Sequence, residues 1–416
     1  MRKCFFWIIV ILAATPAIAQ YNFYLYEKTD KFNLGPWLRY NKADGGFTGV
    51  TTQYFFSRDF YLSGRGGYAF SGKYPRYAVE VKKIFPSGNN EYSLSIDYHN
   101  LTFSKDQSII PDIQNSLGAL LFRSDFYDHY ESRGGLFRFG KEWSGTVKVN
   151  LFAGLEQYEN LRNRTKKSLF DWGGDKRNGK KIFAPSPPVA EGDDYFAGID
   201  YEIDFRPSPL AFVSAWYFKG KLQSSRLVKK VFDGDFSYHR ADVTFKRYQK
   251  LFARHKLVVG LRLASHQGKT TFESDTTAVM SPQDQFLFDA GGISTLRGYR
   301  YREFQNGNRL VLLNVDYAFN NSFLPKTPLT KIWGIGWIFK NFDLIFFADA
   351  GYVWLNRDNR SFVNFDGIKL KDFKANAGTG LAMSDWIRFD FAWALKSGIA
   401  TKRGDWQFNF RIVQKL

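Results

Sequence analysis

Apolar and polar residues alternate along much of this chain with the two-residue period of a β-strand. In residues 310–319, LVLLNVDYAF, one phase is wholly apolar and the other contains Asn314 and Asp316. Residues 194–205 and 386–396 repeat the pattern, with a continuous apolar phase opposite one that carries charged residues. Because successive side chains point to opposite faces of a strand, each segment predicts a strand with one hydrocarbon-like face and one polar face.

Sixteen segments show this alternation, and many of them run for about 10 to 13 residues. A tilted strand needs roughly 9 to 11 residues to cross a bilayer, whereas sandwich strands usually end near 5 or 6. The segments are 46–56, 60–70, 75–85, 91–103, 133–143, 145–157, 194–205, 209–219, 235–248, 254–267, 284–290, 309–319, 342–354, 372–382, 386–396 and 405–414.

Alternation alone leaves two fold classes open, because a soluble β-sandwich also buries one apolar face of each strand. Strand length favours a membrane-spanning barrel, and so do the aromatic residues at the ends of the apolar faces, such as Phe60, Tyr68 and Phe70, or Trp406 and Phe410. The sequence therefore predicts an all-β fold, a membrane-spanning antiparallel β-barrel of about sixteen strands.

The first twenty residues have the three parts of a secretory signal peptide. Arg2 and Lys3 precede a short apolar stretch, and the small residues Ala17 and Ala19 suit cleavage after residue 19. A membrane anchor is the less favoured alternative, because the apolar stretch is too short to span a bilayer. We expect a signal peptide at 1–19, a periplasmic N-terminal segment at 20–45, a barrel at 46–416, and export to the bacterial outer membrane.

One long connection, residues 104–132, is expected to contain a short helix, since IPDIQNSLGALLF spaces its apolar residues at nearly helical intervals. Counting strands from a periplasmic N-terminus, with the first strand at 46, puts this connection on the periplasmic side. The connection at 160–193 is rich in Pro, Gly and Lys and predicts an irregular loop.

Composition limits the chemistry. The 416 residues carry a net charge of +18, 19% aromatic residues and one cysteine, Cys4, which leaves with the predicted signal peptide. The mature chain then has no thiol, so disulfides and thiolate chemistry are excluded. The five histidines never fall at metal-ligand spacing, and we expect no metal or cofactor. Export argues against nucleic acid as a partner.

Two motifs that suggest other chemistry are incomplete. Residues 174–181, GDKRNGKK, nearly match a phosphate-binding loop, but Lys181 stands where Ser or Thr would hold Mg²⁺. Ser265 and His266 are adjacent on a predicted strand and so point to opposite faces. An outer-membrane enzyme, such as a lipase-like barrel, is the least favoured hypothesis, and we predict no enzymatic activity.

Three motifs occur in order across residues 286–354. The first, FDAGGISTLRGY, contains Gly291, Gly292, Arg297, Gly298 and Tyr299. The second is Asn314-x-Asp316 on the next strand, and the third is an aromatic-x-Asp-x-Gly pattern matched by Phe347, Asp349 and Gly351. This ordered set resembles the Omp85 superfamily of outer-membrane barrels, the BamA/TamA-like barrels. Residues 39–46, RYNKADGG, and the closing hairpins look like Bacteroidota-type members.

The resemblance implies a sixteen-stranded barrel whose sixth extracellular loop folds back into the lumen. Arg297 at the loop tip would grip acidic residues of the inner wall, and the strand phases place Asp316 and Asp349 on that inner face. A planar guanidinium suits two carboxylates. Gly298 is expected to allow a sharp loop tip, and Tyr299 to pack it.

The same resemblance implies a role in inserting or translocating proteins, or lipids, at the outer membrane. Family members that do so normally carry POTRA domains before the barrel, and this sequence shows no segment for one. The expected partners are outer-membrane lipid, client proteins and a separate periplasmic protein that replaces POTRA domains. The alternative hypothesis is a passive channel or structural barrel without a translocase role. The last residue, Leu416, differs from the aromatic residue that commonly ends such barrels.

Overall fold

The computed structural model describes most of the chain. It covers residues 26–29, 31–170, 172–177, 180–208, 211–252, 254–268, 284–319, 323–333, 336–356, 361, 363–383 and 387–412. The predicted signal peptide, residues 20–25 and the C-terminal Leu416 lie outside this part. The chain divides into two compact units: unit 1 is 1–86, 93–137 and 156–187, and unit 2 is 87–92, 138–155 and 188–416.

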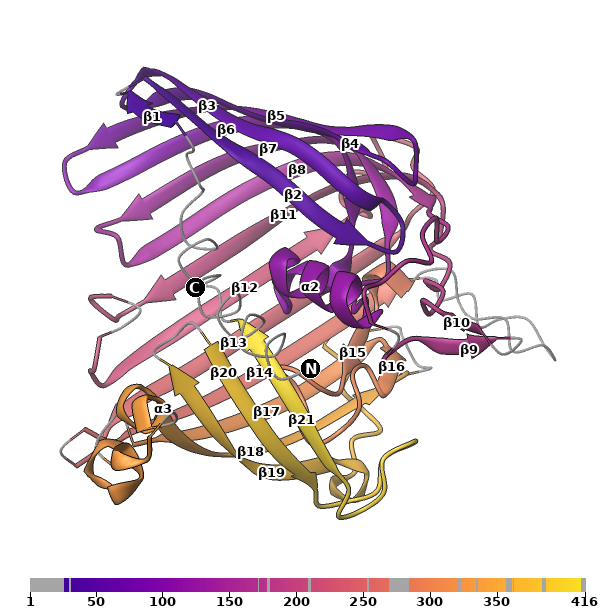
Figure 1. Cartoon of the computed structure of the whole chain (residues 1–416). Helices are drawn as coiled ribbons and strands as arrows, with labels where there is room; N and C mark the ends of the chain where they lie inside the picture. The colour runs from indigo at the N-terminus through magenta and orange to yellow at the C-terminus, as the bar shows by residue number, and fades with distance from the viewer. Residues whose placement is uncertain are drawn as a thin grey trace. The chain divides into compact units, whose positions relative to one another are not determined.

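Unit 1 is built on a run of antiparallel strands, each paired with the next one along the chain. These are β1 (Tyr26–Thr29), β2 (Phe32–Asn41), β3 (Gly45–Ser57), β4 (Phe60–Ala69) and β5 (Tyr74–Ser87). The unit also holds most of β6 (Asn90–Phe103), about half of β7 (Tyr130–Trp143), the short pair β9 (Asp175–Arg177) and β10 (Lys180–Ile182), the 3₁₀ turn η1 (Lys105–Ser108) and helix α2 (Asp112–Phe122). Helix α2 packs against β2 (Figure 1).

Unit 2 contains most of β8 (Val147–Asn160) and a longer antiparallel run in chain order. Its strands are β11 (Gly192–Asp204), β12 (Ala215–Ser224), β13 (Tyr238–Lys250), β14 (Lys256–Gly268), β17 (Arg309–Ala318), β18 (Asp343–Trp354), β19 (Lys374–Met383), β20 (Ile387–Ala394) and β21 (Trp406–Ile412). A separate two-stranded sheet pairs β15 (Phe288–Ala290) with β16 (Phe304–Gly307).

The helical segments of unit 2 are all short. They are η2 (Asp284–Phe286), η3 (Leu324–Lys326), η4 (Pro328–Lys331), α3 (Gly336–Asn341) and η5 (Leu370–Asp372). Within the described residues of the chain, no helix has the length and apolar content that crossing a membrane requires.

The strands of unit 2 expose their apolar face and bury their polar one. On β20, Phe391 and Trp393 are 40% and 44% exposed, whereas Arg388 and Asp390 on the other phase are only 6% and 1% exposed. On β18 the same inversion leaves Phe346 exposed. A water-soluble sheet would do the opposite, because exposed hydrocarbon is costly in water. The outward face therefore suits lipid.

The first long strand differs from the sequence prediction. We expected the barrel to begin at 46, but β2 already pairs with β3 from Phe32 opposite Tyr54 to Asn41 opposite Gly45. Pro36 lies in the middle of β2 and has no N–H to donate, so β2 forms around a residue that is rare inside strands. Pairing with β3 makes residues 32–41 a strand of the sheet that the alternation pattern missed.

The predicted strand at 284–290 is wrong in extent and in partner. Only Phe288–Ala290 is extended, after the 3₁₀ turn η2, and it pairs with β16 rather than with a long strand. Its apolar side chains enter the core of unit 2 instead of facing outward. With β2 gained and this segment lost, the described residues still contain sixteen long strands: β2 to β8, β11 to β14 and β17 to β21.

The helix predicted in 104–132 is present as α2. The additional strand β2 changes the side of the membrane to which strand counting assigns this helix. Because β2 precedes β3, the β6–β7 connection falls at the same strand ends as the β2–β3 turn. Contacts agree, since the Tyr40 backbone N–H donates to Ser116 Oγ of α2 at 3.1 Å. For a chain that starts in the periplasm, strand counting with β2 included assigns this connection to the extracellular side, and the side stays a prediction.

Candidate functional site

Three polar residues form one row across strands β17, β18 and β19. The register puts Asn314 opposite Asp349, and Asp349 opposite Asn376. The Asp349 side chain is fully buried. Its two oxygens accept from the amide nitrogens of Asn314 and Asn376, each at 2.7 Å. The two amides thus hold one buried carboxylate in a fixed orientation, and its negative charge favours a cation beside it.

Arg297 supplies that cation from the 291–303 loop. Its Nε and Nη2 donate to the two oxygens of Asp349 at 2.9 and 2.6 Å, and its Nη1 donates to Asp316 at 2.8 Å. The guanidinium carbon also lies 3.7 Å from the ring centroid of Phe347. A planar guanidinium satisfies this fork-like arrangement in a way that a lysine cannot. Arg297 itself is 2% exposed.

A second arginine shares the same carboxylates. Arg388 donates to both oxygens of Asp316 at 2.8 and 3.1 Å, and its Nε donates to Asp390 at 2.6 Å. We refer to Arg297, Arg388, Asp316, Asp349 and Asp390 as the ion-pair cluster. Burying this many charges is tolerable only because each one has an opposite charge and hydrogen bonds close by.

Tyr299 and Gly298 hold the loop beside Arg297. Tyr299 is fully buried, and its hydroxyl donates to the carbonyls of Ala375 and Lys396 at 3.0 and 2.9 Å. A Cβ on Gly298 would come within 2.5 Å of the Asn376 Cβ. We expected this glycine to provide a sharp turn; in the structure, it permits close approach to β19 and β20.

The other motif glycines have separate roles. Gly291 has a φ of +122° and Gly292 a φ of +76°, so the double glycine forms the turn that starts the loop. Gly351 lies on β18, where a Cβ would stand 3.0 Å from Leu312 and 3.4 Å from Leu296 of the loop. The motif glycines therefore form the turn that starts the loop and allow the loop to pack closely against β18.

Glu303 anchors the far end of the loop to the β20–β21 turn. Its Oε1 accepts from the backbone N–H groups of Ile399, Ala400 and Thr401 at 2.7 to 2.9 Å. The loop is thus fixed at two places, by Arg297 on the strands and by Glu303 on a neighbouring turn.

Sequence reasoning found Arg297, Gly298, Tyr299, Asp316 and Asp349, and the structure brings all five together in unit 2. It missed Arg388, Asp390, Asn376 and Glu303. A signal was present for two of them, because Arg388 and Asp390 share the polar phase of their strand. Their partners depend on strand register, which single-strand alternation does not encode. The role of the five residues as a lock stays a prediction.

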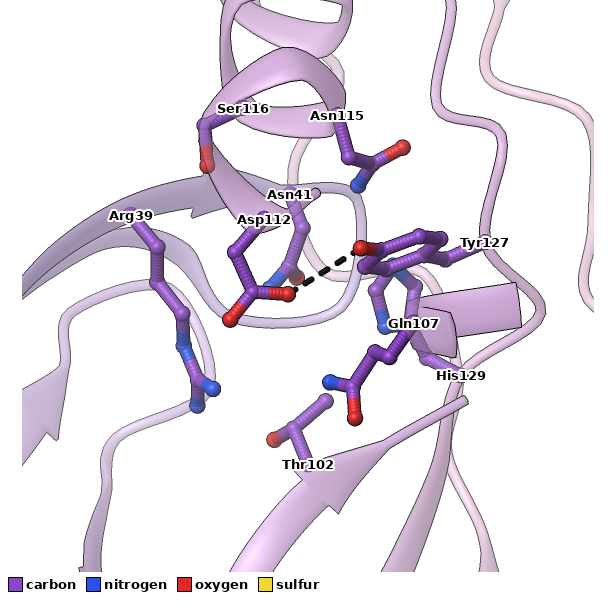
Figure 2. Close-up of a pocket in the computed structure, with 9 residues that line it drawn as sticks. All are labelled: Arg39, Asn41, Thr102, Gln107, Asp112, Asn115, Ser116, Tyr127 and His129. Atoms are coloured by element: carbon purple, nitrogen blue, oxygen red, sulfur yellow. Dashed lines mark hydrogen bonds between the residues drawn. The ribbon is translucent and has the colours of Figure 1, made fainter. Parts of the chain in front are cut away.

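A small polar pocket lies in unit 1. Figure 2 shows Arg39 and Asp112 facing each other across it, with the Tyr127 hydroxyl donating to Asp112 at 3.1 Å. Arg39 pairs with the fully buried Asp44 of the β2–β3 turn at 2.8 Å. The lining residues are Arg39, Asn41, Thr102, Gln107, Asp112, Asn115, Ser116, Tyr127 and His129.

Asp125 ties this pocket to the β2–β3 turn. It accepts from the Lys42 backbone N–H at 2.7 Å, from Asn115 at 2.9 Å and from the His129 ring at 3.0 Å. Burial alone would raise the pKa of Asp125, but His129 and Lys42 outweigh burial and lower the pKa to about 2. At Asp44 burial again opposes the charge, and Arg39 with the hydrogen bonds of Asn41 and Thr102 lowers the pKa.

Other candidate chemistry finds little support in the described residues. No group of three His, Cys, Asp or Glu in them suits a metal ion. His266 is fully buried and its ring stacks on Tyr238 and Phe286, an apolar setting for a side chain weighed as a catalytic base. Parts of the 174–181 segment lie outside the described residues; Lys181 Nζ there donates to the Trp172 carbonyl at 3.2 Å.

A comparison with protein families decides the identity of the fold. The model of the Omp85 superfamily domain matches residues 85–415. The chain belongs to the Omp85 superfamily. The sixteen long strands with an exposed apolar face are those of an antiparallel outer-membrane β-barrel, and the ion-pair cluster lies within the matched residues.

The solved structure of a BamA barrel supports this fold. BamA from Haemophilus ducreyi lacking POTRA domains 1–3 is 14% identical, covers 91% of this chain and 69% of that chain, and gives a TM-score of 0.51. CdiB from Acinetobacter baumannii is 13% identical, with 92% of this chain and 59% of that chain covered and a TM-score of 0.40. At this identity the likeness to BamA concerns the fold alone. No curated protein sequence matches this chain significantly.

Proposed function

We propose that this Omp85 barrel takes part in inserting or translocating proteins, or lipids, at the outer membrane, without covalent chemistry. The observation that carries the proposal is the loop 291–303, which Arg297 fastens to the polar face of β17 and β18 and Glu303 fastens to the β20–β21 turn. Members of the superfamily are transport or assembly barrels. They work with partners, and we propose that a separate periplasmic protein delivers the clients.

The covered polar face supports this proposal over a passive channel. A porin leaves the polar face of its strands to water and ions. Here Asp349, Asn376 and Asp390 are at most 2% exposed, because the loop and its partners occupy the space in front of them. A side-chain clamp, unlike a strand ladder, can be released without unfolding the sheet, which suits a barrel that changes state during its work.

Quantitative proteomics of the outer membrane and culture medium after depletion of the protein tests the proposal. Loss of other barrels, or of a surface or secreted protein, supports an assembly or export role and identifies the client class. If the proteome stays unchanged and the outer-membrane lipid composition shifts, the lipid alternative holds. If neither changes, the translocase proposal fails and a channel or structural barrel is favoured.

Conductance in planar bilayers separates the channel directly. We expect low conductance from the wild-type protein and higher conductance from Arg297→Ala, because the variant frees the loop. Arg300→Ala is the matched control, since Arg300 is an exposed arginine of the same loop. High conductance of the wild type would contradict the proposal.

A further inference from the structure

The β17–β18 connection is far larger than its neighbours at the same end of unit 2. It runs over residues 319–342, whereas the β13–β14 and β19–β20 connections occupy only 251–255 and 384–386. It contains η3, η4 and α3, which extend beyond the ends of β17 and β18 (Figure 1). An elaborate connection at one place indicates a specific task.

Its side chains are both aromatic and basic. Trp333 is 97% exposed and Trp337 is 46% exposed. The further exposed apolar residues are Phe323, Leu329 and Ile332. Residues 319–342 contain three lysines, Lys326, Lys331 and Lys340, and no aspartate or glutamate. Leaving this much apolar surface in water is unfavourable, so the surface needs an occupant.

The connection is continuous with the outward apolar face of the strands. The Phe319 ring lies 5.6 Å from Phe346, which is exposed on β18, and 5.5 Å from Phe323 of the connection. At the other end Trp337 lies 6.2 Å from Phe342, whose ring is 6.0 Å from Phe389 of β20. The aromatic surface thus passes from the strand face that suits lipid into the connection without a polar break at these contacts.

We infer that the β17–β18 connection is a membrane-interface anchor that lies on the phospholipid surface at its end of the barrel. Tryptophan and lysine together are typical of the headgroup region, where an indole ring and an ammonium group both find favourable surroundings. The positive charge without any acid matches anionic headgroups. This inference needs the barrel to be in a membrane but not the translocation role.

Single-cysteine labelling tests the anchor in the full-length protein reconstituted into vesicles. The one native cysteine, Cys4, falls in the predicted signal peptide, so each introduced thiol is labelled alone in the mature chain. An environment-sensitive dye is placed at Ile332→Cys, which keeps both tryptophans. Headgroup-labelled quencher lipid and aqueous iodide then report which phase surrounds the dye.

Two matched positions calibrate the result. Phe391→Cys lies on the exposed apolar face of β20, and Arg403→Cys lies on the exposed β20–β21 turn. We expect the dye at 332 to be quenched by lipid as at 391, and iodide quenching to be several-fold weaker than at 403. A dye at 332 that iodide reaches as easily as at 403 would overturn the inference and favour a protein occupant of this surface.

Two variants add a readout on the anchoring groups. Trp333→Ser with Trp337→Ser should raise iodide quenching of the dye at 332 several-fold while the dye at 391 is unaffected. Changing all three lysines to glutamate should do the same in vesicles that contain phosphatidylglycerol, and less in purely zwitterionic vesicles. If neither the tryptophan nor the lysine substitutions change the quenching, the inference is overturned, because the barrel itself then shelters the dye.

Discussion

The ion-pair cluster of unit 2 and the polar pocket of unit 1 both bury carboxylates, but the cluster fixes a loop and the pocket fixes a hairpin turn. Asp349 and Asp44 each have a fully buried side chain with an arginine partner. Asp349 is held by a loop that folds onto strands β17, β18 and β19, which pair with one another through their own backbone ladders. Asp44 lies in the turn of its own hairpin and accepts from Asn41, three residues earlier, and from Thr102.

The arginines differ as well. All three guanidinium nitrogens of Arg297 donate to carboxylates, whereas Nε of Arg39 finds no hydrogen-bond partner within the described residues. Breaking the cluster should therefore release a loop, and breaking the pocket should loosen a turn and helix α2.

The largest effect is expected from Asp349→Ala. This change leaves buried Arg297 with less counter-charge, and the free energy of unfolding should fall by about 3 to 5 kcal/mol. Thermal unfolding in detergent measures the loss, and protease cleavage within 291–303 should appear before the strands are cut. The control Arg300→Ala removes an exposed charge and should change stability by less than about 0.5 kcal/mol. Equal protease protection in both variants would show that the cluster does not hold the loop.

Gly298→Ala tests how closely the loop packs on the strands without removing a charge. Its new Cβ would meet the Asn376 Cβ at 2.5 Å and Ala394 N at 3.1 Å, so the loop must lift or the strands must shift. We expect a loss of about 1 to 3 kcal/mol in unfolding free energy. At Gly66 a Cβ meets nothing within 4 Å, and Gly66→Ala should be nearly neutral. Similar losses in the two variants would contradict the close seat assigned to the loop.

Acid should weaken the pocket selectively. The pKa of Asp125 is about 2 in the folded protein, below the usual value of about 3.9 in an unfolded chain. The unfolded chain therefore binds more protons between these values, so the stabilisation is complete above about pH 4 and disappears as pH falls to about 2. A shift of this size corresponds to about 2 to 3 kcal/mol.

Hydrogen exchange of α2 across this pH range checks the acid effect. The protection of wild-type α2, taken relative to Asp125→Asn at the same pH, should fall between about pH 4 and pH 2. The exposed Asp233 gives a control, and Asp233→Asn should keep the wild-type dependence. A wild-type protection that follows Asp125→Asn at every pH would exclude the assigned role of Asp125.

Tyr299→Phe should have the smallest effect. The variant keeps the ring that packs on Phe304 and loses only the hydroxyl that bonds the Ala375 and Lys396 carbonyls. The expected loss is about 1 kcal/mol. Tyr54, whose ring is 40% exposed, provides the control Tyr54→Phe, which should be neutral in the same melt. A loss several times larger at 299 would mean that the hydroxyl, not the ring, positions the loop.

Alternation was enough to find most strands because side-chain direction on a strand depends only on position along the chain. It failed where the local signal was weak or misleading. Residues 32–41 were not among the predicted strands, although all ten pair with β3. The short alternation at 284–290 predicted a strand of the barrel. In the structure, only Phe288–Ala290 is extended, and its side chains pack inward with the loop. One missed strand then reversed the side assigned to α2.

By itself the sequence determined that the chain is rich in amphipathic strands, and its ordered motifs indicated the superfamily and three residues of the ion-pair cluster, Arg297, Asp316 and Asp349. Only the tertiary structure decided that Arg388 and Asp390 complete the cluster, that Asn314 and Asn376 orient Asp349, and that Glu303 anchors the loop. The reason is physical. The phase of a residue is a local property, but a partner is fixed by strand register and by where a loop returns, and both depend on contacts between residues far apart in the chain.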